Sequence, residues 1–450
     1  MPRSATILPL LLSAALVMAA CSSKTSDNNN NTGQPVKVPL ATFELEKLWT
    51  AASTDWEPYI AADLGSQWVY QATTRATSTR MKIMVRASSD GGVTWGNDVL
   101  VSSTTSAYDP QLAVARDTGC VFAAYLEPSD WLIYVRSSCD HGATWSTPVC
   151  TTPSTWSGDH PWLLVTPSGI DVYVAFNATP PGVSEDAGEG YVAVSHNGGA
   201  SFTQVYVTGT NQEYWFEDGG ALGPNGEIYV ANAVFSLDYT GPASVVLWRS
   251  NNAGASFETL TLATSEEVQD CSWDAACDFG FFAAQAAVAV DAGGRIMFVW
   301  SASTTPGGPM KMYAAFSPGG DAWRDFGAPI VLSSDLYDSN FPTAAAGPTS
   351  GDFRVAWQSR SSSTNLQTWN TWYQATIDGG NTWIVSPVRL SNRTDGATYK
   401  ADLGYGFPFG DFLGLAVDSA GMTQVVWGEA DSRSGPGGSW YTRTVPPASN

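Results

Sequence analysis

The chain has 450 residues, of which 44% are hydrophobic and only 14% are charged, and its formal net charge is −21. This acidic balance argues against nucleic acids and anionic membrane surfaces as partners, because both repel negative charge. The length suits one large domain, and the 43 glycines and 19 tryptophans are typical of short strands, many turns and aromatic packing between sheets.

The N-terminal segment carries signals for export. Arg3 precedes an apolar run over residues 7–20 that is too short to span a membrane, and this run ends at Cys21. The sequence Met-Ala-Ala-Cys resembles a bacterial lipobox, in which a lipid is attached to the cysteine, although leucine is more usual at the place of Met18. We therefore predict a signal peptide over 1–20, lipidation of Cys21 and a flexible tether over 21–39. The protein would then be an exported lipoprotein of the outer membrane or cell surface that touches the membrane through its lipid alone.

A repeated pattern of two strands follows from residue 40 to residue 447. Each copy has an acidic or proline-containing start, an apolar run, a Gly-type turn, and a second apolar run that often ends in an aromatic residue. The seven copies begin at Glu57, Asp109, His160, Asp218, Ala287, Pro342 and Gly414.

A second repeat, an eight-residue turn, lies downstream of six of these copies. Its pattern is Ser-x-Asp-x-Gly-x-Thr-Trp, and the copies begin at Ser88, Ser138, Ser195, Ser250, Ser317 and Thr376. Asp or Asn in such a turn accepts hydrogen bonds from backbone N–H groups two residues on, and glycine supplies the positive φ that the turn requires. Because turn chemistry explains these residues, we expect them to be structural rather than catalytic.

This turn resembles the Asp box of the BNR repeat proteins of the sialidase-like superfamily, and the resemblance extends over residues 40 to 447. It implies a β-propeller and a carbohydrate ligand. The sialidases of that superfamily use an arginine triad, a tyrosine nucleophile backed by a glutamate, and an aspartate acid/base. Their F/Y-R-I-P motif is missing from this chain, so no catalytic residue can be carried over from them.

The repeats predict an all-β, seven-bladed β-propeller with Asp-box turns, and a six-bladed propeller is the alternative. The seventh blade has two strands and a third near residues 440–445 before the chain ends. Residues 41–48 could supply its fourth strand, so that strands from both termini close the ring and remove the free sheet edges.

Five cysteines remain after Cys21, and export permits disulfides. Cys271 and Cys277 are close enough in sequence to pair. Cys120 opens a strand and Cys139 closes its antiparallel neighbour, so these two could also pair and leave Cys150 free. Other pairings stay open. We expect no cofactor, and whether a structural calcium ion is bound is left open.

The order of strands in a blade locates the candidate site. If the strands run A to D from the axis outward, the Asp-box turns join C to D on the lower face. The segments before strand A and after strand B then lie on the upper face, where loops converge. Three arginines of neighbouring blades follow a strand B, and together they could clamp a carboxylate; they are Arg75, Arg360 and Arg433.

Acidic and aromatic residues surround the predicted starts of the A strands. Paired carboxylates could act as acid and base on a glycosidic bond, and the candidates are Glu57, Asp109, Asp159, Glu213 and Asp338, with Asp55, Glu217 and Asp278 nearby. His160 could act as a general base. Sugar rings could stack on Tyr59, Trp162 and Trp215, and also on Tyr214, Phe341 and Tyr405. Each of these residues also has a structural interpretation, as a turn cap, an ion pair or a core side chain.

Two functions fit this pattern. The first is an exo-glycosidase that acts on sialic or uronic acid glycans, and the second is a propeller that binds a carbohydrate or glycoprotein without catalysis. A polysaccharide lyase that uses His160 and a tyrosine is a more remote third. Whether the protein is an enzyme stays open at this point, and we expect it to be a monomer.

Overall fold

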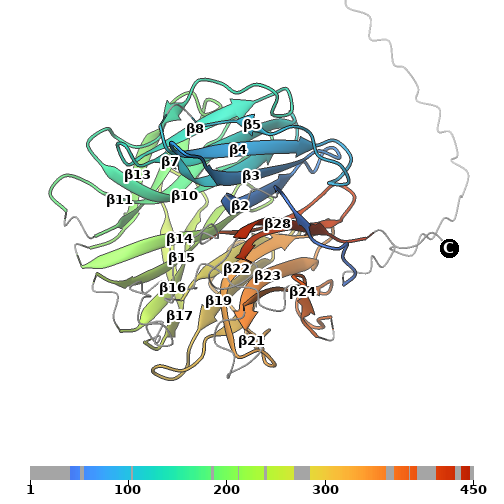
Figure 1. Cartoon of the computed structure of the whole chain (residues 1–450). Coiled ribbons are helices and arrows are strands. Elements are labelled where there is room, and N and C mark those ends of the chain that lie inside the picture. Colours follow the sequence, from blue (N-terminus) through green and yellow to red (C-terminus); the bar gives the residue numbers. More distant parts are fainter. Residues whose placement is uncertain are drawn as a thin grey trace, which may run out of the picture. The chain divides into compact units, whose positions relative to one another are not determined.

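The protein is a seven-bladed β-propeller (Figure 1). The computed structural model describes residues 41–50, 55–102, 105–183, 187–210, 212–237, 241–267, 284–360, 369–384, 386–392, 412–430 and 437–445. These ranges contain seven antiparallel four-stranded sheets and no helix, hence no helix that could cross a bilayer. The seven blades predicted from the repeats are confirmed, and the six-bladed alternative is wrong.

The strands fall into four concentric layers, taken blade by blade. The innermost strands are β2 (Asp55–Ala62), β6 (Tyr108–Ala115), β10 (Ser157–Val165), β14 (Glu213–Leu222), β18 (Ala286–Val290), β22 (Asp338–Ala346) and β26 (Leu413–Val417). The second strands are β3 (Val69–Ala76), β7 (Cys120–Glu127), β11 (Val172–Thr179), β15 (Ile228–Ser236), β19 (Ile296–Ala302), β23 (Phe353–Arg360) and β27 (Thr423–Ala430). The third strands are β4 (Met81–Ser88), β8 (Leu132–Ser138), β12 (Glu189–Ser195), β16 (Ala243–Ser250), β20 (Lys311–Ser317), β24 (Asn370–Thr376) and β28 (Gly437–Arg443). The outermost strands are β5 (Val99–Leu100), β9 (Val149–Cys150), β13 (Thr203–Thr208), β17 (Glu258–Ser265), β21 (Ile330–Val331), β25 (Val388–Arg389) and β1 (Lys47–Leu48).

The ring is closed by strands from both ends of the domain. Each innermost strand contacts the innermost strand of the next blade, and β26 of blade 7 contacts β2 of blade 1. The outermost strand of blade 7 is β1, which pairs antiparallel with β28. The segment predicted to supply the missing strand therefore supplies it. An ion pair reinforces the closure, because Arg443 Nε lies 2.8 Å from the Glu44 carboxylate.

Each repeated turn joins the third and fourth strands of its blade and is held by its own side chains. In blade 1, Ser88 Oγ donates to Asp90 (2.7 Å), the backbone N–H of Gly92 donates to Ser88 Oγ (2.8 Å), and the N–H and hydroxyl of Thr94 donate to the Asp90 carboxylate (2.9 and 2.6 Å). The aspartate thus bonds to the N–H four residues on, not two residues on as predicted.

The turns also hold neighbouring blades together. The Tyr70 hydroxyl of the preceding blade lies 3.2 Å from Nδ1 of His141 in the turn of blade 2, and the ring of Trp68 stacks on the same imidazole. At the ring closure, the hydroxyl of Tyr441 donates to the carbonyl oxygen of Gly92 (3.1 Å) and Arg443 donates to that of Gly91 (2.8 Å). The turn residues are therefore structural, as predicted, and they mark the lower face of the ring.

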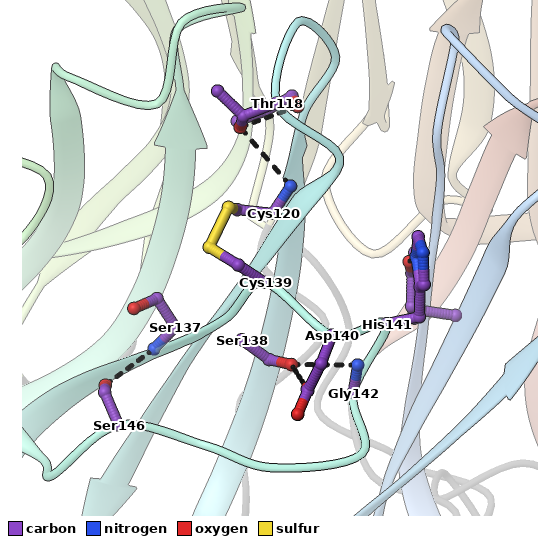
Figure 2. Close-up of a disulfide and its surroundings, with 11 residues drawn as sticks. Thr118, Cys120, Ser137, Ser138, Cys139, Asp140, His141, Gly142 and Ser146 are labelled. Carbon is purple, nitrogen blue, oxygen red and sulfur yellow. Dashed lines mark hydrogen bonds between the residues drawn. A yellow bond between two sulfur atoms is a disulfide. The ribbon is translucent and has the colours of Figure 1, made fainter.

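A disulfide joins Cys120, at the start of β7, to Cys139 in the turn that follows β8 (Figure 2). This pairing was predicted from the antiparallel register of the two strands, and it is confirmed. Cys150 carries a free thiol, also as predicted. Cys21, Cys271 and Cys277 lie outside the described residues, so the lipidation and the second disulfide stay predictions.

Candidate functional site

The upper face, opposite the repeated turns, carries a recurring irregularity at the beginning of the innermost strands. In four blades the register with the second strand shifts at an X-Pro step, and the residue before the proline has a left-handed backbone: Glu57 (φ 50°), Asp109 (φ 56°), His160 (φ 50°) and Phe341 (φ 56°). Residues other than glycine rarely adopt this conformation, and proline further restricts the residue before it. Each instance costs about 1–3 kcal/mol, and such strain is found mostly at functional sites.

Side chains of one blade bind backbone N–H groups of the next blade at this level. The Glu57 carboxylate accepts from the N–H of Asp109 (3.0 Å), and the Asp218 carboxylate accepts from the N–H of Ala286 (3.0 Å). In blade 5, the side-chain carbonyl of Gln285 accepts from the N–H of Phe341 (3.2 Å). A bulge leaves backbone groups unpaired, and these contacts satisfy them. Because the amide of Gln285 makes this contact in blade 5, accepting a backbone N–H of the next blade does not require a carboxylate.

Six polar residues at this level form what we call the axial cluster: Glu57, Asp109, Asp159, His160, Glu217 and Asp218. They come from blades 1 to 4, and a chain of hydrogen bonds and electrostatic contacts joins them. Four of the six predicted acid/base candidates therefore lie together.

Glu57 and Asp109 form a carboxyl pair within the axial cluster. Both are buried, at 3% and 8% exposure. Burial raises the pKa of Glu57, hydrogen bonds from the Asp109 backbone, the Thr74 hydroxyl and the Asp109 side chain oppose the rise, and the charge of Asp159 adds to it. The resulting pKa of about 7 lets the pair hold a proton at neutral pH.

Asp159 is a partly exposed carboxylate of the axial cluster, as is Asp218. The hydroxyl of Tyr214 donates to Asp159 (2.9 Å). Loss of hydration raises the pKa of Asp159, while the hydrogen bonds from Tyr214 and from the backbone of His160 lower it. Glu217 is fully buried, and burial together with the charge of Asp218 raises its pKa well above the usual range.

His160 occupies the axis itself. Its ring stacks on Phe216 (3.7 Å between ring centroids) and, across the ring of blades, on Phe412 (4.7 Å). Its Nδ1–H donates to the carbonyl oxygen of Glu217 (2.8 Å), an assignment that follows because a carbonyl can only accept. Burial lowers the pKa of His160 to about 3, so its imidazole is neutral at pH 7. The three stacked rings close the axis at this level.

A small recess lies beside the three rings. It has room for roughly one or two water molecules. Its walls include His160, Trp162, Asp218, Gln285, Phe341 and Phe412. The recess is too small for a sugar ring, so a glycan would have to lie above it, against the upper face.

Two of the three arginines predicted as a carboxylate clamp, Arg75 and Arg360, are engaged by the protein. Arg75 binds Asp55 through Nε and Nη2 (2.6 and 2.8 Å) and Asp98 through Nη1 (2.6 Å). Arg360 is buried, its Nη2 lies 3.6 Å from the Asp338 carboxylate, and its guanidinium lies over the Tyr337 ring. Arg433 lies outside the described residues. The clamp stays a prediction, and the contacts of Arg75 and Arg360 give it no support.

Other predicted site residues serve the fold. Trp215 is 6% exposed and packs against Trp248, so its face is closed to a sugar. Tyr59 and Trp162 pack edge to face on each other (5.7 Å).

Two of the predicted carboxylates accept hydrogen bonds from residues outside the axial cluster. Glu213 accepts from the Trp215 indole (3.3 Å), and Asp338 accepts from the backbone of Met310 (3.0 Å). Asp278 and Tyr405 lie outside the described residues. Within the described ranges, no three His, Cys, Asp or Glu side chains are arranged to hold a metal ion.

Three residues that were not predicted as site residues also lie at the axial level, namely Asp218, Gln285 and Phe412. Their positions in blades 4, 5 and 7 correspond to those of Glu57, Asp109 and His160 in blades 1 to 3. The repeats already placed Asp218 at the start of its copy, whereas Gln285 and Phe412 lie two residues before the copy starts at Ala287 and Gly414. The proline that marks this position in four blades is missing from these three, so the signal was weak.

Comparisons with known proteins agree on the fold. No protein-family model and no curated protein sequence matches the chain. Among solved structures, an ulvan lyase described as a new family of polysaccharide lyase is similar at 10% identity with a TM-score of 0.52, over 89% of this chain and 94% of the other. At this identity the likeness concerns the propeller fold alone.

Two further structures are more distant. A Hadza microbial sialidase has a TM-score of 0.46 at 14% identity, over 87% of this chain and 65% of the sialidase chain, so this protein spans less than two thirds of it. An α-L-arabinofuranosidase from Fusarium graminearum has a TM-score of 0.47 at 13% identity, over 78% of this chain and 98% of the other.

Proposed function

We propose that the protein is a glycan-processing propeller, a glycoside hydrolase that works at the axial cluster on the upper face. The observation that carries the proposal is the Glu57–Asp109 pair: two buried carboxyl groups from adjacent blades, held in left-handed backbone conformations, with the pKa of Glu57 raised to about 7. A group that titrates near neutral pH can give a proton to a leaving group and take it back.

The roles follow from the environments of the carboxyl groups. The Glu57–Asp109 pair is the general acid, since it holds a proton that its buried surroundings favour. Asp159 is the base or nucleophile, because it is partly exposed and Tyr214 binds and orients it. Glycoside hydrolases need two such groups on either side of the bond that is cut.

The charges of the upper face bear on the class of glycan but do not choose between acidic and neutral glycans. Sialic and uronic acid glycans, the class expected from the sequence, need a cation beside the acid pair. Arg75 and Arg360 are engaged by carboxylates, so support for an acidic glycan rests on the sequence resemblance to BNR and Asp-box proteins of the sialidase-like superfamily. Neutral glycans fit the acidic upper face at least as well and belong in the same assay.

Hydrolysis of a panel of neutral, sialylated and uronic acid glycosides tests the proposal, with Glu57→Gln as the variant. Gln285 performs the structural task of Glu57 with an amide, so this variant keeps the contact to the next blade and loses only the acid. We expect hydrolysis to fall about 10²–10⁴-fold while the fold is retained. Full activity in Glu57→Gln, or no hydrolysis of any glycoside by the wild type, would contradict the proposal.

A second function has a specific observation in its favour. The carboxylates of Glu57 and Asp218 already bind backbone N–H groups of the next blade, so the axial cluster could serve assembly alone and the upper face could bind glycans without cutting them. Glycan binding by the wild type without turnover would favour this function.

The place of the protein in the cell is a separate proposal. We infer an exported lipoprotein, anchored in the outer membrane or at the cell surface through Cys21. Labelling with a palmitate analogue tests this, and Cys21→Ser should abolish the label. Retention of the label in that variant would contradict the proposal.

A further inference from the structure

Trp131 is the last residue of the loop between β7 and β8, a position at which hairpin loops often have a left-handed residue. Its backbone is left-handed (φ 55°), and its side chain is 50% exposed. For a bulky residue this conformation is an outlier, whereas asparagine or glycine would adopt it at lower cost. In the described part of the chain, no other aromatic ring and no cation packs on the indole.

The loop is fixed in place by two hydrogen bonds of Asp130. The Asp130 carboxylate accepts from the N–H of Leu132 (3.2 Å) and from the hydroxyl of Tyr134 (3.1 Å). The exposed indole is therefore carried on an ordered loop, and an ordered group loses little entropy when it binds a ligand.

The loop lies next to the axial cluster. Trp131 follows a second strand, so it belongs to the upper face, and its carbonyl oxygen accepts from the N–H of Gly158 (2.8 Å). Gly158 directly precedes Asp159 and His160 in β10. Trp131 thus lies on the same face as the proposed acid and base, and its backbone is hydrogen-bonded to the strand that carries Asp159.

The surroundings of the indole fit a sugar better than a protein. The residues beside it in sequence and across the Gly158 contact are exposed and polar, namely Ser129, Asp130 and Ser157. One apolar ring edged by hydrogen-bonding groups matches the apolar face and hydroxyl edge of a pyranose. A protein partner would need a far larger continuous patch.

We propose that Trp131 is the stacking platform of an outer sugar-binding subsite, which holds a pyranose ring of a glycan bound on the upper face beside the axial cluster. The proposal rests on a glycan being the ligand of the upper face. It does not require that the glycan be cut.

The test measures binding by titration calorimetry with a fixed set of probes: chitohexaose, cellohexaose, galactan oligosaccharides, sialyllactose and uronic acid hexasaccharides. For the probe that the wild type binds best, Trp131→Ala and Trp131→Asn should each weaken binding about tenfold, the loss expected when one sugar face no longer covers an aromatic ring. Tyr206→Ala is the matched control, because Tyr206 is equally exposed (53%) but lies on the outermost strand β13; it should bind as the wild type does.

The melting temperature separates binding from folding. Trp131→Asn relieves the backbone strain, so it should unfold at the same temperature as the wild type or about 1–2 °C above it. A lower melting temperature for this variant would overturn the proposal, because the indole would then be a structural residue. Unchanged binding in both Trp131 variants, or no binding of any probe by the wild type, would also overturn it.

Activity distinguishes this proposal from the proposed function. If Trp131→Ala weakens glycan binding but no glycoside is hydrolysed, the subsite stands and the hydrolase fails. If hydrolysis depends on Glu57 but long oligosaccharides are cut and bound equally well without Trp131, the hydrolase stands and the subsite fails.

Discussion

The upper and lower faces of the ring share two structural features but place them in different surroundings. Both contain left-handed backbone and carboxylates at recurring positions. On the lower face, the left-handed residues are mostly glycines. Asp90 is only slightly buried there, and hydrogen bonds from Thr94 and Ser88 outweigh this burial and lower its pKa to about 2. On the upper face, the left-handed residues carry side chains, and burial raises the pKa of Glu57 to about 7.

This difference separates stability from function. A carboxylate whose pKa is lowered stabilises the fold at neutral pH, whereas one whose pKa is raised destabilises it there. Backbone strain and raised pKa values recur at one level of the ring, and both lower the stability of the fold. Such a loss of stability is typical of functional sites.

The largest effect is expected on catalysis. Asp109→Asn should lower kcat about 10²–10⁴-fold, because it removes one member of the acid pair. Asp90→Asn is the matched change on the lower face and should leave kcat unchanged, since Asn197 and Asn252 occupy this position in blades 3 and 4. Steady-state kinetics on the best glycoside checks both. Equal losses in the two variants would erase the distinction between the faces.

The second-largest effect is expected on the pH dependence of stability, which should differ between Glu57→Gln and the wild type. In the folded state the pKa of Glu57 is raised from 4.5 to about 7, so its stabilising contribution is fully present below pH 4.5 and is lost as the pH rises through 7. Glu57→Gln should therefore melt about 2 °C or more above the wild type at pH 8, with a smaller difference at pH 5. Thermal melts across this range check the trend, and a difference that shrinks as the pH rises would contradict it.

A moderate loss of stability is expected on the lower face. Asp90→Ala removes the acceptor for the N–H and hydroxyl of Thr94 and for Ser88. We expect a loss of about 1 kcal/mol, because solvent screens these hydrogen bonds at a largely exposed turn. Chemical denaturation measures it. Asp90→Asn should lose less, because its side-chain oxygen still accepts from the Thr94 N–H.

An equally small effect tests the glycine of a single turn. At Gly142 an added Cβ would lie 3.9 Å from Trp145 and 4.0 Å from Tyr70, which is ordinary contact, so the cost of Gly142→Ala comes from φ +83° alone. We expect about 1 kcal/mol in denaturation experiments. A neutral outcome would mean that left-handed backbone is cheap in this ring, and it would weaken the argument from strain on the upper face as well.

The repeats predicted most of the fold. Their number gave seven blades, the lack of a fourth strand in blade 7 pointed to residues 41–48, and antiparallel register paired Cys120 with Cys139. These predictions depend on periodicity and strand alternation, which are local properties of the chain. The upper face was predicted less well. Four of its six acid/base candidates meet in the axial cluster, and their catalytic role stays a prediction. Arg75 was offered to a ligand although Asp55 and Asp98 bind it, and Trp131 was not noticed.

By itself, the sequence determined how many blades form and where the turns lie, because each depends on residues close together in the chain. It also indicated how the ring closes, because the last repeat lacks a fourth strand and residues 41–48 belong to no other repeat. Only the tertiary structure decided which charged groups meet. Glu57 and Asp109 are 52 residues apart, and they pair because two bulges on adjacent blades aim them at each other. A pKa depends on burial and neighbouring charges, and both arise only when the blades come together.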